Sequence, residues 1–209
     1  MTRAYNQLYL NKCSRNVANM LNAAVILFGY DLADYLDMFA RSNAAKEIEN
    51  GNPFYIAGKS GLELYADVMR DNGLKEPDIS DKELYDRSEV YWTGWVLARY
   101  QWYSGRSFSE IIECIPADEF LRLFSTLHEA DIQKVYDVFD VHFEMQEPNL
   151  KKVRRLCGLT QEELSEISGV SLNTIRAYER KSKNINKAQA NILLDLSKAL
   201  KCTVNDILN

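Results

Sequence analysis

The 209-residue chain has few of the residues that most often carry catalytic or metal chemistry. It holds two histidines, His128 and His142, and neither stands in a His-Glu-x-x-His or comparable ligand spacing. No Ser/His/Asp or Cys/His arrangement is recognisable. The carboxylates near the histidines are explained more simply as helix caps and solvated faces. We therefore expect no catalytic activity, no metal site and no cofactor.

Cysteine and long apolar stretches are also scarce. The four cysteines are scattered, and none forms a Cys-x-x-Cys pair. We interpret them as reduced thiols, mostly small core fillers, in a cytoplasmic protein. No apolar run approaches the length of a membrane span, and residues 1–25 lack a signal-peptide layout. The expected location is the cytoplasm, with no membrane partner.

Positive charge is in deficit over the whole chain, since the net charge is −5. The deficit is unevenly spread. Residues 149–209 hold 11 basic and 6 acidic side chains, whereas residues 1–148 hold 14 and 24. This asymmetry indicates two bodies with different partners. The basic body has the charge that attracts phosphates, and the acidic one suits a basic partner surface, although a solvated acidic face is the commoner cause.

Helical periodicity dominates what is present, and no stretch alternates long enough to predict a strand. An all-α fold is therefore expected. Capping boxes pair Ser60 with Glu63 and Ser80 with Glu83. Helices are predicted at residues 3–27, 31–41, 61–70, 82–104 and 131–143, with shorter ones after Ser107 and at Pro116, and residues 42–59 are expected to be less regular.

The predicted helix 82–104 is crowded with aromatic side chains on more than one face. This distribution is typical of the central helix of a domain. Part of the aromatic surface could instead line a ligand pocket or a partner groove. A pocket of this kind would be closed and lined by residues such as Trp92, Trp95 and Tyr100.

The tetrapeptide Ala57-Gly58-Lys59-Ser60 looks like the tail of a phosphate-binding P-loop. That motif requires glycine five residues before its Gly-Lys-Ser, and Pro53 occupies this position. We therefore interpret Ser60 as a helix cap and do not expect nucleotide binding here.

Pro148 disfavours a helix through residues 146–148, so the sequence divides into domains 1–147 and 148–209. In the second domain Thr160 and Glu163 form a capping box, and Gly169 follows the short helix that they start. Leu164 and Ile167 are expected to face inward. A further helix would be capped by Asn186, and a last one would start at Thr203, with Asp206 completing a capping box.

Ser171 is expected to cap a helix over residues 172–180. Ile175 and Tyr178 would face inward on it. The opposite face carries two arginines and an amide, which suits the reading of base edges in the DNA major groove.

Several motifs together resemble the Cro/C1-type helix-turn-helix family: Leu159-Thr-Gln-Glu-Glu-Leu164, Gly169-Val-Ser171, Thr174-Ile175, Tyr178-Glu-Arg180 and Leu196-Ser-Lys-Ala-Leu200. The resemblance covers roughly residues 149–209. It implies a five-helix, lambda-repressor-like domain that binds a roughly palindromic double-stranded DNA operator as a homodimer and regulates transcription. It also implies a structural ion pair between Arg154 and Glu179.

By the same resemblance Gln161 should touch a phosphate, and residues of the 172–180 helix fall at groove-facing positions. From their chemistry, Asn173 and Arg176 would read bases and Leu172 would touch a thymine methyl. The whole expected DNA-binding set is Gln161, Ser171, Leu172, Asn173, Thr174, Arg176, Ala177, Arg180, Lys181 and Lys183.

Two positions depart from the family pattern. Lys181 stands where the family usually has glycine, and Ile185 stands where it often has proline. Both departures concern the shape of the loop after the 172–180 helix.

Two hypotheses for residues 1–147 remain. In the first, the protein is an antitoxin-like repressor of its own operon, and the acidic domain binds a toxin-like protein. In the second, the domain senses a small molecule and changes the DNA affinity of a ligand-responsive transcription factor.

Overall fold

The computed structural model describes residues 3–75, 78 and 88–209, and every regular element in these ranges is helical. The all-α prediction is therefore confirmed. The chain divides into two compact units, Met1–His142 and Phe143–Asn209, here called the N-terminal and C-terminal units. The helix α8 (Ile132–Gln146) crosses this division.

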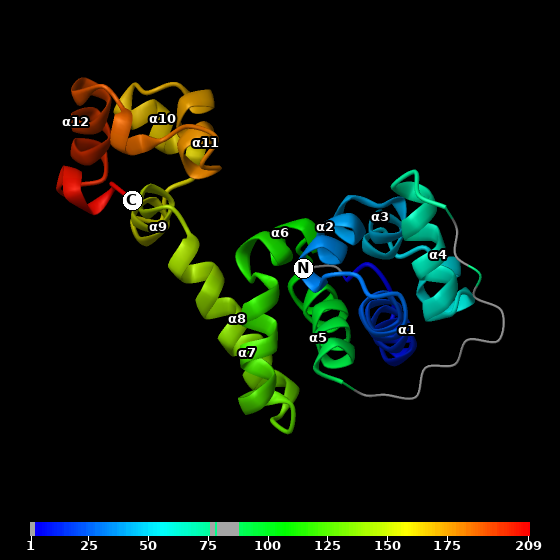
Figure 1. The fold of residues 1–209 in the computed structure, drawn as a ribbon. Helices are drawn as coiled ribbons and strands as arrows, with labels where there is room; N and C mark the ends of the chain where they lie inside the picture. The colour runs from blue at the N-terminus through cyan, green and yellow to red at the C-terminus, as the bar shows by residue number, and fades with distance from the viewer. Residues whose placement is uncertain (1–2, 76–77, 79–87) are drawn as a thin grey trace. The chain divides into compact units, whose positions relative to one another are not determined.

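The N-terminal unit is a helical assembly (Figure 1). Two of its elements are short π-helices. Its elements before α8 are η1 (Gln7–Tyr9), α1 (Leu10–Asn22), η2 (Ala23–Leu27), α2 (Leu32–Arg41), α3 (Asn43–Glu49), η3 (Phe54–Gly58), α4 (Gly61–Asp71), α5 (Glu89–Ser104), α6 (Phe108–Cys114) and α7 (Ala117–Leu127).

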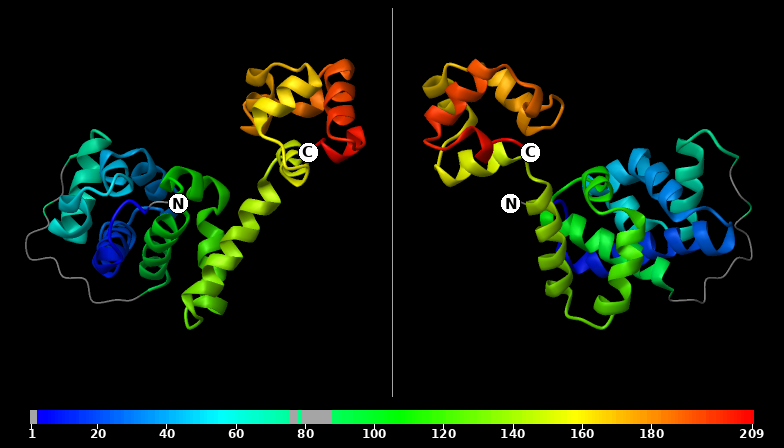
Figure 2. Two further views of the ribbon diagram at one scale, coloured as in Figure 1. Left: turned by 180° about the vertical axis from the view of Figure 1, so that it is seen from behind. Right: turned by 60° about the vertical axis from the view of Figure 1, so that its left-hand side comes forward.

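Helices α1 and α5 lie side by side at the centre of this unit (Figure 2). Gly94 allows the approach, because a Cβ atom there would lie 2.7 Å from the Cα of Ala18 and 2.8 Å from the carbonyl oxygen of Val17. The crossing thus brings backbone against backbone. This confirms that the aromatic helix is central, although its predicted start at Lys82 and the Ser80–Glu83 box lie outside the described residues.

Burial in the N-terminal unit is dominated by aromatic side chains. Tyr35, Phe39, Tyr100 and Phe139 are all fully buried. The Tyr100 ring meets that of Phe139 edge-on, with 5.0 Å between ring centroids. Such edge-to-face pairs stabilise a core beyond the area that they bury.

Local capping signals predicted several helix starts correctly. Ser60 and Glu63 form the capping box of α4, and Ser107 and Glu110 form that of α6. Asp31 caps α2, and its side chain accepts hydrogen bonds from the next helical turn. These helix starts are confirmed. They could be predicted because each depends on only a few neighbouring residues.

Longer-range features differ from the prediction. Residues 3–27 do not form one helix, since α1 begins at Leu10, Leu8 is 85% exposed and the last turn widens into η2. Residues 42–59 are more regular than expected, because Ser42 caps α3 and Pro53 precedes η3. The η3 segment packs against α1, a contact that the local sequence does not reveal.

The C-terminal unit begins with the last residues of α8 and continues with α9 (Asn149–Leu156), α10 (Gln161–Ser168), α11 (Leu172–Glu179), η4 (Ile185–Lys187), α12 (Ala190–Ala199) and η5 (Val204–Asp206). Its core is a single apolar cluster made of Leu150, Leu164, Val170, Ile175, Tyr178, Ile185, Leu196, Leu200 and Ile207.

Two predicted helices of this unit need correction. The fourth long helix starts after Gln189, and Asn186 instead lies in η4, where its side chain donates to the Asn209 carbonyl at 2.8 Å. The last helix has the expected Thr203–Asp206 capping box but is only the three-residue η5. Ile185, which replaces the family's proline, is buried in the core.

No helix in the described ranges is long and apolar enough to cross a membrane. Among the same residues no cluster of histidine, cysteine and carboxylate side chains could hold a metal ion.

Candidate DNA interface

The link between α10 and α11 is built from local rules. Thr160 and Glu163 cap the start of α10, and this hydrogen bonding lowers the pKa of Glu163. Gly169 ends the helix with φ of 71°, a conformation that glycine adopts without steric penalty. Val170 is buried between the helices, and Ser171 then caps α11 through the Thr174 amide. The predicted helix, turn and helix are all present.

Helix α11 has one buried and one accessible side. Ile175 and Tyr178 enter the core, as predicted. Asn173 is exposed, and the other expected groove-facing side chains are partly exposed: Leu172, Thr174, Arg176 and Ala177. The accessible side therefore offers an amide, a guanidinium and small apolar groups together, which are the groups that read base edges.

The prediction that Ile167 faces inward is wrong, since this side chain is 59% exposed. Leu164 is the buried residue of α10, and the partly buried Ser168, one turn later, donates through its hydroxyl to the Leu164 carbonyl at 2.6 Å. Val170 fills the core beyond the helix end.

Arg154 of α9 and Glu179 of α11 form a buried, bidentate ion pair. The Arg154 Nε lies 2.7 Å from Glu179 Oε1, and Nη2 lies 2.9 Å from Oε2. Hydrogen bonding to Glu179 raises the pKa of Arg154 above its ordinary value. Arg154 also donates to the Leu159 carbonyl at 2.6 Å. Removing one partner of such a pair typically costs about 3–5 kcal/mol, because the other charge stays buried.

The structure adds a network that the sequence did not reveal. Gln161 donates to Glu179 Oε2 at 2.7 Å, so it is tied to the buried pair. Arg176 donates through Nε to Gln161 Oε1 at 3.4 Å and through Nη2 to Glu162 Oε1 at 2.7 Å. The proposed base-reading arginine is thus held by a carboxylate of α10. Only the geometry shows this contact, because the partners are 14 residues apart.

The basic residues after α11 lie in an exposed loop. Arg180, Lys181 and Lys183 are all exposed. Lys181 takes a left-handed conformation with φ of 55°, which explains why glycine suits this position in the family. The ammonium of Lys183 lies 5.9 Å from the centre of the Tyr178 ring. The loop adds accessible positive charge directly after α11.

The P-loop-like tetrapeptide has a structural role. Ser60 is the N-cap of α4, and the Lys59 ammonium pairs with Asp67 and lies 4.6 Å from the centre of the Tyr55 ring. The histidines also have structural contacts: His142 Nε2 lies 2.9 Å from Glu119 Oε1, and His128 Nδ1 lies 2.8 Å from the Phe124 carbonyl.

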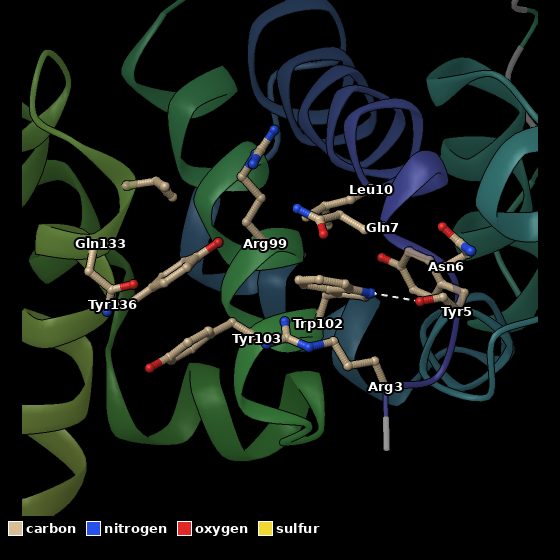
Figure 3. Close-up of a pocket in the computed structure, with 11 residues that line it drawn as sticks. Arg3, Tyr5, Asn6, Gln7, Leu10, Arg99, Trp102, Tyr103, Gln133 and Tyr136 are labelled. Atoms are coloured by element: carbon tan, nitrogen blue, oxygen red, sulfur yellow. Dashed lines mark hydrogen bonds between the residues drawn. The ribbon is translucent and has the colours of Figure 1, made fainter. Parts of the chain in front are cut away.

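The N-terminal unit contains an open pocket of about 590 Å³ (Figure 3). The aromatic residues that line it are Tyr5, Trp102, Tyr103 and Tyr136. The sequence predicted a closed pocket lined by Trp92, Trp95 and Tyr100, but this pocket is open and none of the three residues lines it. Trp92 packs edge-on against Phe124, and the Tyr100 hydroxyl donates to Asp140 at 2.6 Å inside the core.

The C-terminal geometry defines a helix-turn-helix domain with a polar, accessible second helix. Residues 150–207 match the helix-turn-helix family model and form a domain of the Cro/C1 type. This region is a sequence-specific DNA-binding domain of transcription regulators. Comparison with curated proteins returned no match, and neither did comparison with solved structures.

Proposed function

We propose that the protein is a repressor that binds a palindromic operator as a homodimer and blocks a promoter by occupying it. The observation that carries this proposal is the accessible side of α11, where Asn173 and Arg176 lie next to Leu172. Two-fold dimers of this fold class bind half-sites about one helical turn apart. The protein would act in the cytoplasm, where the operator is.

Each residue of the interface has a proposed role. Asn173 and Arg176 contact adenine and guanine edges, and Leu172 contacts a thymine methyl. The remaining members contact phosphates or the groove wall without reading sequence, namely Gln161, Ser171, Thr174, Ala177, Arg180, Lys181 and Lys183. Gln161 would contact a phosphate while its side-chain amide also donates a hydrogen bond to Glu179.

Selection of binding sites from a random duplex pool tests the proposal. The full chain should enrich a two-fold symmetric motif with half-sites about ten base pairs apart. A motif without symmetry would contradict the dimer, and recovery of unselected sequences would contradict specific readout. A transcription assay on the selected site should show lower output as protein is added.

We further propose that the N-terminal unit binds a basic, toxin-like protein, so that the chain acts as an antitoxin-like autoregulator. Two features support this role. Residues 1–148 carry ten more acidic than basic side chains, and several large apolar side chains of the unit are exposed, including Leu8, Ile26 and Phe54. Apolar and charged surface together favour protein association.

An affinity pull-down from the native cell, with the full chain and residues 1–147 as parallel baits, tests the partner. One stoichiometric basic protein on both baits supports the autoregulator. Companions that depend on DNA, with none on the short bait, would contradict it.

The second candidate is a ligand-responsive transcription factor. The pocket of about 590 Å³ favours it, because its volume falls in the range typical of small-molecule sites. The corresponding test is a change in operator affinity when a ligand is added to the full chain.

A further inference from the structure

The pocket of the N-terminal unit is assembled from three separate segments (Figure 3). One wall is formed by residues of the chain before α1 and by Leu10, the first residue of α1. The last turns of α5 contribute Arg99, Trp102 and Tyr103, and the first turn of α8 contributes Gln133 and Tyr136. All three walls belong to one compact unit.

The charge of the pocket is opposite to that of its unit. Arg3 and Arg99 line it, and no aspartate or glutamate is among the lining residues. Neither arginine forms an ion pair with any residue that the structure describes. Asp137 of α8 accepts a hydrogen bond from the lining residue Gln133 at 2.9 Å and does not itself line the pocket. Two unneutralised cations in an acidic unit indicate a site for an anion.

The two arginines are held by different contacts. The guanidinium carbon of Arg3 lies 3.8 Å from the centre of the Trp102 ring and 5.7 Å from that of Tyr103. This stacking leaves the N–H groups of Arg3 at the edge of the ring. Arg99 stacks on Trp95 at 4.1 Å and donates to Asn11, while its buried Nε has no hydrogen-bond acceptor. Arg3 is exposed and makes no hydrogen bond with a residue that the structure describes, so its donors are open to a ligand, whereas the partnerless Nε of Arg99 is buried.

The aromatic rings of the pocket contact one another and the chain before α1. Tyr103 and Tyr136 stack with 4.3 Å between centroids and 15° between ring planes. The Trp102 indole donates to the Tyr5 carbonyl at 2.9 Å, which fixes the indole against the chain before α1. Arg3 covers one face of Trp102, and Tyr103 and Tyr136 cover one face of each other, so a planar ligand would stack on the opposite faces of these rings.

We propose that this pocket binds a small planar organic anion, of which an aromatic carboxylate is the simplest form. Its carboxylate pairs with the guanidinium of Arg3, its ring stacks on the aromatic wall, and the Gln133 amide borders the opening. As a regulatory site this pocket rests on the second candidate function, the ligand-responsive regulator. Binding of the anion itself depends only on contacts within the N-terminal unit.

Calorimetry with the full chain tests the site. The probes are indole-3-acetate and salicylate, and their neutral amides serve as matched ligands. Both anions should bind, and the amides should bind about tenfold more weakly, since the charge-assisted hydrogen bonds are lost. Arg3→Gln should weaken anion binding by a similar factor. The control Arg41→Gln removes an exposed arginine of α2 outside the pocket and should change nothing.

Three results would overturn the proposal. They are no heat of binding up to about 5 mM of either anion, equal affinity for anion and amide, and equal effects of Arg3→Gln and Arg41→Gln. Operator affinity is measured separately with and without the bound anion. Anion binding that leaves operator affinity unchanged would contradict the sensor function and leave the ligand site established.

Discussion

Lys181 is one of two described non-glycine residues with positive φ, and the other is Lys201 at 53°. A side chain in this conformation costs about 1–2 kcal/mol, part of which is regained because glycine loses more entropy on folding. Lys181→Gly should therefore raise the free energy of unfolding of residues 148–209 by about 1 kcal/mol. Urea denaturation followed by circular dichroism measures this change.

The same variant should bind DNA more weakly, because Lys181 is a proposed phosphate contact. Lys201→Gly is the matched control: it relieves the same backbone conformation outside the proposed interface and should leave DNA affinity unchanged. Equal loss of DNA affinity in both variants would remove Lys181 from the interface.

Glu162 competes with DNA for the proposed reader Arg176, through the contact of 2.7 Å between Oε1 and Nη2. The carboxylate side chain is 57% exposed, so the contact is worth at most about 1 kcal/mol. Glu162→Gln should tighten operator binding by up to about fivefold. Electrophoretic mobility shift or fluorescence anisotropy measures it.

Glu166→Gln provides the matched comparison, because Glu166 is an exposed carboxylate on the same helix. It removes the same charge near DNA without freeing Arg176. If both variants gain operator affinity equally, the gain reflects general charge repulsion. The prediction that Glu162 and DNA compete for Arg176 is then wrong.

At the scale of the elements, the crossing of α1 and α5 depends on Gly94. The space for a Cβ atom is occupied by the backbone of Ala18 and Val17 at 2.7–2.8 Å. Gly94→Ala should destabilise the N-terminal unit by about 1–3 kcal/mol, the usual cost of overpacking, despite the better helix propensity of alanine. A thermal melt of residues 1–147 checks this. An unchanged melting temperature would mean that the helices separate at little cost.

Predictions from the sequence succeeded where a few neighbouring residues determine the structure. The capping boxes at Ser60, Ser107, Thr160 and Thr203 are all present, and so is the turn at Gly169. The buried face of α11 and the Arg154–Glu179 pair were also predicted, the pair because the family resemblance implied it.

Predictions failed where distant segments decide the outcome. Ile167 is exposed, and Val170, beyond the end of α10, enters the core. The π-helix η3 packs against α1, while η2 continues α1 and contacts α2 and α4, and no local pattern marks either of them. The pocket joins Arg3, Trp102 and Gln133, which lie far apart in the sequence.

At the scale of the whole molecule, charge separates the two units. The basic C-terminal region attracts phosphates, whereas the acidic residues 1–148 repel them. Residues 148–209 alone should therefore fold and bind a non-specific duplex of about ten base pairs, too short for two protomers, more tightly than the full chain. The difference should shrink between about 50 mM and 200 mM salt.

Circular dichroism of the fragment is the control for folding. Tighter non-specific binding by the full chain, with a steeper dependence on salt, would contradict this account, because it would mean that the N-terminal unit contributes phosphate contacts.

Whether α11 reads sequence can be measured by comparing the affinity of Arg176→Ala for a selected operator with its affinity for an unrelated duplex. We expect operator binding to weaken by about 1–3 kcal/mol while non-specific binding changes little, since a bidentate base contact is lost. Lys183→Ala, a proposed phosphate contact, should weaken both alike. If Arg176→Ala also lowers both affinities equally, Arg176 contacts a phosphate and the proposed readout is wrong.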